Sequence, residues 1–130
     1  MFEISKKTRS ELPIGSSLLK KTKEIVVGKK YDLSLVLIEN NLSKKLNKKF
    51  RGKNRPTNVL SFSLSKNSGE IFLNLPLIKK QAVSYDLSQK NFLLYLFIHG
   101  LLHLKGLEHG KKMDRQEKIL ASKLKISIPQ

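Results

Sequence analysis

The chain has 130 residues, of which 26 are Lys or Arg and 10 are Asp or Glu, so its formal net charge is +16 and its pI is near 10.2. This length suits one hydrophobic core, and we expect residues 1–130 to form a single domain. The absence of cysteine excludes disulfide partners and thiolate metal ligands. No signal-peptide run opens the sequence, and its longest apolar stretch, 92–98, is too short to span a bilayer. We therefore expect a cytoplasmic protein without a membrane-spanning segment.

The excess of basic residues is typical of a protein with an anionic partner, and nucleic acid is the leading candidate. Lysine outnumbers arginine 22 to 4, which an A/T-rich genome would favour whatever the function. Codon bias explains that preference better than it explains the shortage of acidic residues. A membrane surface is the alternative partner, but no segment separates a lysine-rich face from an apolar face as an interfacial helix does.

The first half of the chain alternates predicted strands and helices. Residues 2–5 and 31–39 combine alternation with β-branched residues and predict two strands. Between them, residues 16–28 begin with serines that can cap a helix and end at a glycine. Residues 40–52 begin with asparagines that can act in the same way, and they also end at a glycine. Both segments predict helices.

The second half predicts a pair of strands followed by helices. Residues 59–64 and 69–74 predict two strands around the turn-prone sequence SKNSG. Residues 76–85 begin with a proline, which the first turn of a helix tolerates. Ser88 can cap a long helix over residues 89–106, and the glycine at its end supplies the stop.

The last predicted helix, residues 111–125, is amphipathic. Its expected apolar face is formed by Met113, Ile119, Leu120 and Leu124. Strands early in the chain and helices late in it argue for an α+β fold, with a single small mixed sheet packed against helices. A candidate metal site lies on the C-terminal, helical part.

All three histidines of the chain fall within the sequence HGLLHLKGLEH, residues 99–109. His99 and His103 are four residues apart, which places both imidazoles on one face of a helix and close enough to bind one ion. His109 follows the helix-ending Gly106 and can fold back as a third ligand. Three protein ligands and a fourth position left for water are typical of a catalytic zinc site. Zinc is the expected metal, although the same imidazoles also suit nickel.

The same histidine spacing occurs in metzincin proteases, in which glutamate follows the first histidine and acts as general base. This chain has Gly100 at that position, and Met113 follows His109 too closely to form a separate Met-turn. Both features disfavour a peptidase. Because glycine inside a helix costs about 1 kcal/mol relative to alanine, we expect something, for example a substrate, to approach the backbone closely at Gly100.

The histidine segment resembles the H-G-x-L-H-L-x-G-Y-D-H motif of the YbeY family of bacterial metal-dependent endoribonucleases. Upstream, LNKKFRGKNRPTNVLSFS is similar to the family's L-N-x-x-[YF]-R-x-K-x-x-[PA]-T-[DN]-V-L-S-F segment, and GEIFLN is similar to its G-D-I-x-I strand. Downstream, Met113 and Glu117 match the family's M-x3-E spacing. Together these matches cover residues 46–120, in the family's order.

Three positions depart from the family pattern, and none of them removes a histidine. Leu107 stands where the family usually has Tyr, Glu108 where it has Asp, and Asn58 where Asp is common. Glu108 keeps a carboxylate next to His109, where it can orient a ligand imidazole, reach the metal-bound water or point into solvent. Packing is the simpler explanation for Leu107.

The resemblance implies cleavage of single-stranded RNA, notably in maturation of the 3′ end of 16S ribosomal RNA and in ribosome quality control, with the ribosomal small subunit as partner. It also implies that Arg51 sits in the catalytic cleft near the metal. A guanidinium can stabilise the charge that develops on phosphoryl oxygens, and a histidine-bound metal can polarise the phosphate and activate water. By the same resemblance, Thr57, Asn58 and Ser61 shape the loop and strand beside the site.

Residues 44–55, KKLNKKFRGKNR, carry a run of basic residues and no acidic one. A groove that follows the backbone of single-stranded RNA requires such charges, and we expect Lys53 and Arg55 to contact RNA. A solvated helix face is the alternative explanation for part of the lysines. Phe50 and Phe62 are candidates for base stacking, with core packing as the simpler role.

Three functions of different classes fit these features. A metal-dependent endoribonuclease of ribosome maturation is the leading one. The second is a hydrolase of another substrate, a peptidase included, that uses the same metal. The third is a ribosome-binding module in which the metal serves the structure.

Overall fold

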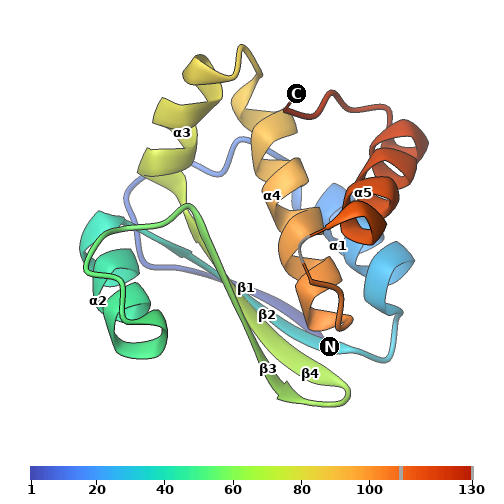
Figure 1. The fold of residues 1–130 in the computed structure, drawn as a ribbon, viewed down its shortest axis with the longest axis horizontal. Coiled ribbons are helices and arrows are strands. Elements are labelled where there is room, and N and C mark those ends of the chain that lie inside the picture. The colour runs from blue at the N-terminus through green and yellow to red at the C-terminus, as the bar shows by residue number, and fades with distance from the viewer. Residues whose placement is uncertain (109, 130) are drawn as a thin grey trace.

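The computed structural model describes residues 1–108 and 110–129, and their elements follow the predicted order (Figure 1). The strands are β1 (Phe2–Lys6), β2 (Asp32–Ile38), β3 (Val59–Ser65) and β4 (Ser68–Asn74). The helices are α1 (Ser16–Val27), α2 (Asn40–Arg51), α3 (Leu75–Ser84), α4 (Gln89–Leu104) and α5 (Lys111–Leu124). The α+β class is confirmed.

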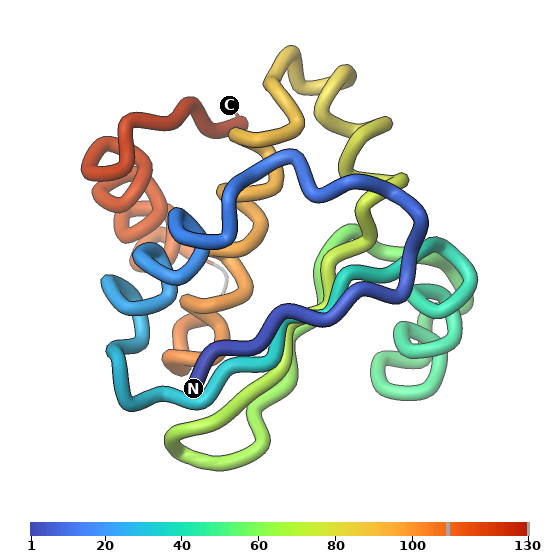
Figure 2. Tube along the Cα trace, turned by 180° about the vertical axis from the view of Figure 1, so that it is seen from behind, coloured from blue at the N-terminus to red at the C-terminus, as the bar shows by residue number. Residues whose placement is uncertain are grey.

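The strands form one mixed sheet, as predicted, and their order within it is β1-β2-β4-β3. β1, β2 and β4 are parallel, whereas β3 and β4 form an antiparallel hairpin. Figures 1 and 2 show α1, α4 and α5 on one side of the strands and α2 by itself on the other. The main core lies on the α4 side, where inward side chains of β2 and β4 such as Leu35 and Ile71 are fully buried.

Helix α4 is the centre of this core. Most of its side chains between Phe92 and Leu102 are buried, because the helix packs on the sheet as well as on α1, α3 and α5. It is the most apolar helix described, yet within residues 1–108 and 110–129 no helix has both the length and the apolar character needed to cross a membrane.

Two glycines allow α4 to lie very close to β4. A Cβ atom at Gly100 of the helix would come within 3.1 Å of the Ile71 side chain on the strand. A Cβ at Gly69 of the strand would lie 2.9 Å from the Leu104 side chain on the helix and 2.5 Å from the Tyr31 hydroxyl. The expected close approach at Gly100 is therefore real, but the group that approaches is Ile71 of the core. The suggestion that a substrate approaches there is wrong.

Two of the predicted helix caps are wrong. α1 is preceded by Gly15 at the cap position, and Ser16 already belongs to the helix, so its hydroxyl lies one position too late to cap it. α2 is preceded by Glu39, and no side chain caps it. The Asn40 side chain accepts a hydrogen bond of 2.8 Å from Asn74 instead, so a tertiary contact takes the place of the cap.

The other predicted helix ends are confirmed. Ser88 caps α4, since its hydroxyl accepts a 3.1 Å hydrogen bond from the amide of Asn91. α3 carries its proline in the first turn. α2 ends at Gly52 with a φ of 69°, and Gly106 follows α4 with a φ of 97°, both in the region that glycine adopts without strain.

The buried face of α5 differs from the prediction at one residue. Met113 and Leu120 are buried and Leu124 packs against the core, as expected, but Ile119 is 51% exposed. Position 119 lies off the stripe that Met113 and Leu120 define at helical spacing, and Glu117 occupies that stripe in its place. A carboxylate thus enters the core beside α4.

We expect Gly69→Ala to destabilise the protein by about 1–3 kcal/mol, because the added methyl group overlaps the Tyr31 hydroxyl and Leu104. Tyr31→Phe should be neutral or stabilising by about 1 kcal/mol, since this buried hydroxyl has no hydrogen-bond partner among the described residues. The double variant should recover part of the loss. Urea unfolding measures all three. An equal cost of Gly69→Ala in both backgrounds would show that the hydroxyl is not the obstacle.

Candidate active site

The candidate site is built on the histidine pair of α4. His99 and His103 lie on successive turns of one helix face, and their Nε2 atoms are 3.2 Å apart. The rings are nearly perpendicular, at 81°, with centroids separated by 4.7 Å. Both residues are partly buried. The two ring nitrogens therefore converge on one point at the protein surface, as their spacing predicted.

This geometry fits two ligands of a single metal ion. Two imidazole nitrogens that bind one tetrahedral zinc at about 2.0–2.1 Å stand about 3.3 Å apart. The observed Nε2–Nε2 distance of 3.2 Å matches that value. His99 and His103 can therefore hold a divalent metal without moving far.

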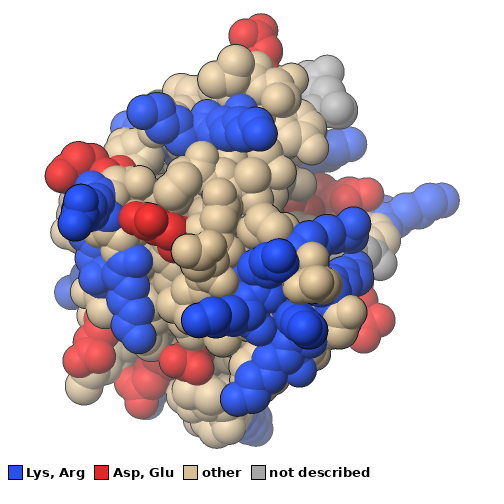
Figure 3. Space-filling model, turned by 90° about the vertical axis from the view of Figure 1, so that its left-hand side faces the viewer, with Lys and Arg blue, Asp and Glu red and all other residues tan. Residues whose placement is uncertain are grey.

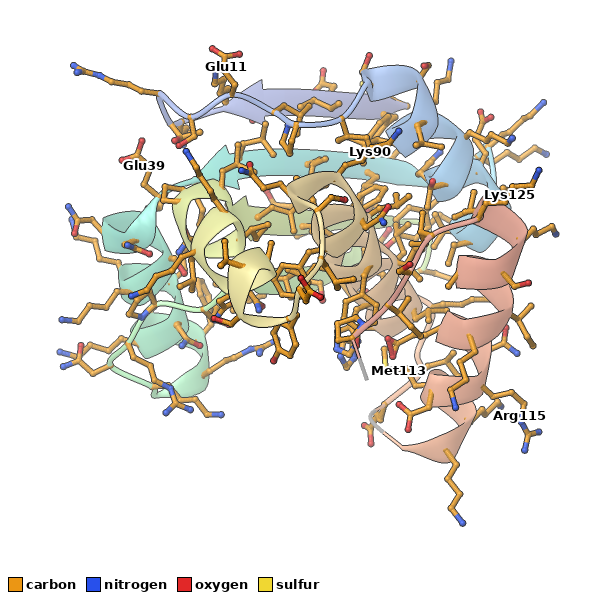
Figure 4. All side chains as sticks on the ribbon, turned by 90° about the horizontal axis from the view of Figure 1, so that it is seen from above. Glu11, Glu39, Lys90, Met113, Arg115 and Lys125 are labelled. Carbon is orange, nitrogen blue, oxygen red and sulfur yellow. The ribbon has the colours of Figure 1, made fainter. Side chains whose placement is uncertain are left out.

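The carboxylate of Glu117 lies behind the first histidine. Its Oε2 is 3.4 Å from Nδ1 of His99, and the Glu117 side chain is only 5% exposed. When His99 carries its proton on Nδ1, this N–H donates to the Glu117 carboxylate. The Nε2 lone pair is then directed at the metal position, which is the usual arrangement for a metal-binding histidine. In Figure 4, Met113 of α5 points toward α4, whereas Arg115 points away from it.

Tyr95 lies one turn before His99 on α4, with 6.2 Å between the ring centroids. Burial, followed by the charge of Glu117 and a hydrogen bond to it, raises the pKa of Tyr95 to about 12. The phenol therefore stays protonated at neutral pH and serves as a hydrogen-bond donor. Together, His99, Tyr95 and Glu117 form a connected group that spans α4 and α5.

A pocket of about 230 Å³ opens beside His99. Its lining includes Asn58, Tyr85, Tyr95, Leu96, His99 and Pro129. Its walls thus come from the start of β3, the end of α3, one face of α4 and the C-terminal segment.

His109, the predicted third ligand, lies outside the described residues. Within residues 1–108 and 110–129, no group of three or more His, Cys, Asp or Glu side chains is close enough to hold a metal ion. The described part of the candidate centre is therefore the pair formed by His99 and His103. Glu108 is exposed and makes no hydrogen bond or ion pair within those residues, while Leu107 packs against the core.

Arg51 is the last residue of α2 and is exposed, as are Lys53 and Arg55. Among the described residues, the Arg51 guanidinium makes no hydrogen bond or ion pair, so the structure does not join it to the histidines. It remains available to an anion. Figure 3 shows the surrounding charge, with Lys and Arg side chains gathered on the side of the molecule where α2 lies.

The segment that carries Lys53 and Arg55 is fixed by buried polar side chains of α2. The hydroxyl of Ser43 donates to the carbonyl of Thr57 at 2.7 Å and accepts from its amide at 2.9 Å. The amide of Asn47 donates to the carbonyl of Arg55 at 2.8 Å. Ser43 and Asn47 are almost fully buried. The backbone is therefore held inward, and the basic side chains extend outward.

The same segment is joined to α3 at the edge of the pocket. The backbone carbonyl of Asn58 accepts from the amide of Asn74, and its side-chain amide donates to Gln81 at 2.9 Å. Asn74 also caps α3 and donates to the carbonyl of Thr57 at 3.3 Å. Asn58 also lines the pocket beside His99, so these contacts fix the position of part of its wall.

Sequence reasoning matched Asn47 and Glu117 to family motifs but assigned them no role, and it passed over Tyr95 and Ser43. One signal was present for Glu117, since an acidic residue on the apolar stripe of a helix is rarely buried without a partner. The residues that pack around Tyr95, Ser43 and Asn47 come from other elements, so their burial has no local sequence signal.

The fold and the histidine pair together define a small α+β protein with a candidate metal centre on its central helix, α4. The family model described as endoribonuclease YbeY matches residues 3–126. Endoribonuclease YbeY of Pelagibacter ubique is 34% identical, over 95% of this chain and 91% of that one, and the Neorickettsia sennetsu protein of the same name is 33% identical, over 85% of each. The solution structure of TM1509 from Thermotoga maritima aligns with a TM-score of 0.67 at 30% identity, over 95% of this chain and 89% of that one. The chain belongs to the endoribonuclease YbeY family, a family of RNA-cleaving enzymes.

We expect Glu117→Gln to weaken Zn²⁺ binding by about 10- to 100-fold, because His99 loses the carboxylate that orients its ring and raises its basicity. A competition titration against a zinc indicator measures the affinity. Asp114→Asn is the matched control, since it removes the same charge from an exposed position on the same helix. Equal affinities of the two variants would contradict the role assigned to Glu117.

Proposed function

We propose that the chain is a metal-dependent endoribonuclease that cleaves single-stranded RNA in the cytoplasm. Its proposed cellular role is maturation of the 3′ end of 16S ribosomal RNA and ribosome quality control at the small subunit. Membership in the endoribonuclease YbeY family supports the cleavage of RNA. The observation that carries the metal dependence is the convergence of two histidine nitrogens at 3.2 Å, with Glu117 behind one of them.

His99 and His103 are the proposed metal ligands, and His109 is proposed as the third on the basis of its spacing. Zinc is the proposed ion, and nickel suits the same ligands. When bound, a divalent metal at this position supplies Lewis acidity and a water of lowered pKa. Glu117 keeps the His99 ring in the orientation that the ion requires.

The proposed role of Arg51 is to stabilise the negative charge that accumulates on the phosphoryl oxygens during cleavage. A guanidinium can contact two of these oxygens at once. The exposure of Arg51 and its lack of an acidic partner within the described residues support this role, because no carboxylate competes with the phosphate there. Lys53 and Arg55, which follow Arg51 in the chain, are proposed to bind phosphates of the RNA backbone.

Arg51→Ala should lower the rate of RNA cleavage by about 100- to 1,000-fold while metal content and folding stay unchanged, because it removes only a group that acts on the transition state. The assay is cleavage of a labelled single-stranded ribosomal RNA fragment, with metal quantified in each preparation. Arg115→Ala is the control, since this arginine projects from α5 away from α4 (Figure 4). Equal cleavage by all three proteins would reject Arg51 and point to a contaminating nuclease.

His103→Ala should abolish stoichiometric Zn²⁺ binding and reduce the stability of α4 and α5, because His99 is left as the only described ligand. Metal analysis and thermal unfolding with and without Zn²⁺ measure the two effects. Wild type should gain stability on adding Zn²⁺, and the variant should not. If the variant bound one Zn²⁺ as tightly as wild type, His103 would not be a ligand.

RNA binding by wild type without cleavage under any metal would favour the alternative function, a ribosome-binding module.

A further inference from the structure

The pocket beside His99 has a row of aromatic rings along one wall. Tyr85 packs on Phe92 with ring centroids 5.3 Å apart, Phe92 is stacked with Tyr95 at 6.4 Å, and Tyr95 is followed by His99 at 6.2 Å. Phe92 and Tyr95 are held in the helix, whereas Tyr85 is 51% exposed. The row therefore begins at an open ring face and ends at a candidate metal ligand.

Tyr85 is anchored although its ring is exposed. It caps the end of α3, where its amide donates to the carbonyl of Gln81 at 3.1 Å. One side of its ring rests against Phe92, which is only 2% exposed. A ring that is already held in place loses little entropy when a flat ligand stacks on it.

Asn58 provides a directed polar group in the same pocket. Its side-chain amide donates to the side-chain carbonyl of Gln81 at 2.9 Å, which fixes the orientation of the group and leaves Oδ1 as an acceptor and the second Nδ2–H as a donor. The same Gln81 holds Tyr85 through its backbone. One residue of α3 thus positions both the aromatic surface and the polar group.

The size and chemistry of the pocket suit one nucleobase. Its volume of about 230 Å³ is below the roughly 300 Å³ at which drug-sized ligands begin to be bound. Bases of single-stranded RNA are recognised by stacking on aromatic side chains and by hydrogen bonds to their edges. Pro129 of the C-terminal segment lines one side of the pocket, and this segment lies beside the start of α4 in both views (Figures 1 and 2).

We propose that this pocket binds one base of single-stranded RNA, which stacks on Tyr85 and presents its edge to Asn58, so that the attached phosphodiester lies at His99. The proposal rests on the proposed function and adds a base-binding subsite to it. A purine stacks on Tyr85 over a larger area than a pyrimidine, so the subsite prefers adenine to uracil, and Asn58 can pair with the amino group and the adjacent ring nitrogen of adenine. Tyr85 and Asn58 are positioning residues, since neither reaches the reacting atoms.

Binding is tested first, independently of cleavage. The chain has no tryptophan, so Tyr85→Trp introduces a single fluorescent reporter at the pocket. The metal-loaded variant is mixed with oligoadenylate in a stopped-flow instrument, so that binding is read before cleavage. An abasic ribose-phosphate oligomer of equal length is the control. Quenching by oligoadenylate alone supports the proposal, and equal responses to both oligomers overturn it, because contact with phosphate alone would then explain the signal.

Cleavage kinetics provide the second test. Tyr85→Ala should raise KM for oligoadenylate about 5- to 150-fold, Tyr85→Phe should restore it, and Tyr85→Leu should not, because only a ring replaces the stacking surface. Val83→Ala, at a residue of the same helix that is 80% exposed, is the control and should leave KM unchanged. Asn58→Ala should also raise KM for oligoadenylate, because the contact to the edge of the base is lost. An unchanged KM in Tyr85→Ala overturns the proposal.

The two tests separate the subsite from the proposed function. If wild type cleaves no RNA while the fluorescence of the Tyr85→Trp variant still distinguishes oligoadenylate from the abasic oligomer, the nuclease proposal fails and the base-binding pocket stands. If wild type cleaves RNA and neither the fluorescence nor KM responds to the base, the pocket proposal alone fails.

Discussion

The site depends on how closely α4 lies against β4. Gly100 faces Ile71, and Gly69 faces Leu104, so a side chain at either glycine would push the helix outward. His99 and His103 are the neighbours of Gly100 and Leu104 on α4. Glu117 contacts His99 because α5 packs on the same helix. A displacement of α4 would therefore change the relation of the histidines to the sheet and to α5 together. Core packing sets the geometry of the candidate metal centre.

A second, polar constraint fixes the segment after α2 that carries Lys53 and Arg55. Ser43 and Asn47 on α2 hold the segment after that helix through its backbone, and Asn74 joins this segment to the start of α3. These side chains are buried and hydrogen-bonded, so each would leave an unsatisfied partner if it were removed. The basic side chains of the segment can therefore extend into solvent while the backbone that carries them is held in place.

The sequence predicted what local patterns determine. The order of strands and helices, the cap at Ser88 and the proximity of His99 to His103 follow from periodicity and spacing, and the structure confirms them. Features set by contacts between distant segments were missed. The glycine in α4 was explained by a substrate because Ile71 lies elsewhere in the sequence. Ile119 was placed in the core because its hydrophobicity outweighed its angular position on α5.

In the proposed function, the charges and the pocket divide the recognition of RNA between them. The basic side chains around α2 would contact phosphates, which are the same in every nucleotide and therefore add affinity without selectivity. The pocket beside His99 is lined by aromatic rings and Asn58 and carries no lysine or arginine among its described lining residues. Selectivity among bases has to come from such an uncharged surface, since stacking and edge contacts are what differ from one base to another. Because that surface adjoins the candidate metal ligand, a base bound there would determine which phosphodiester bond lies next to the proposed metal.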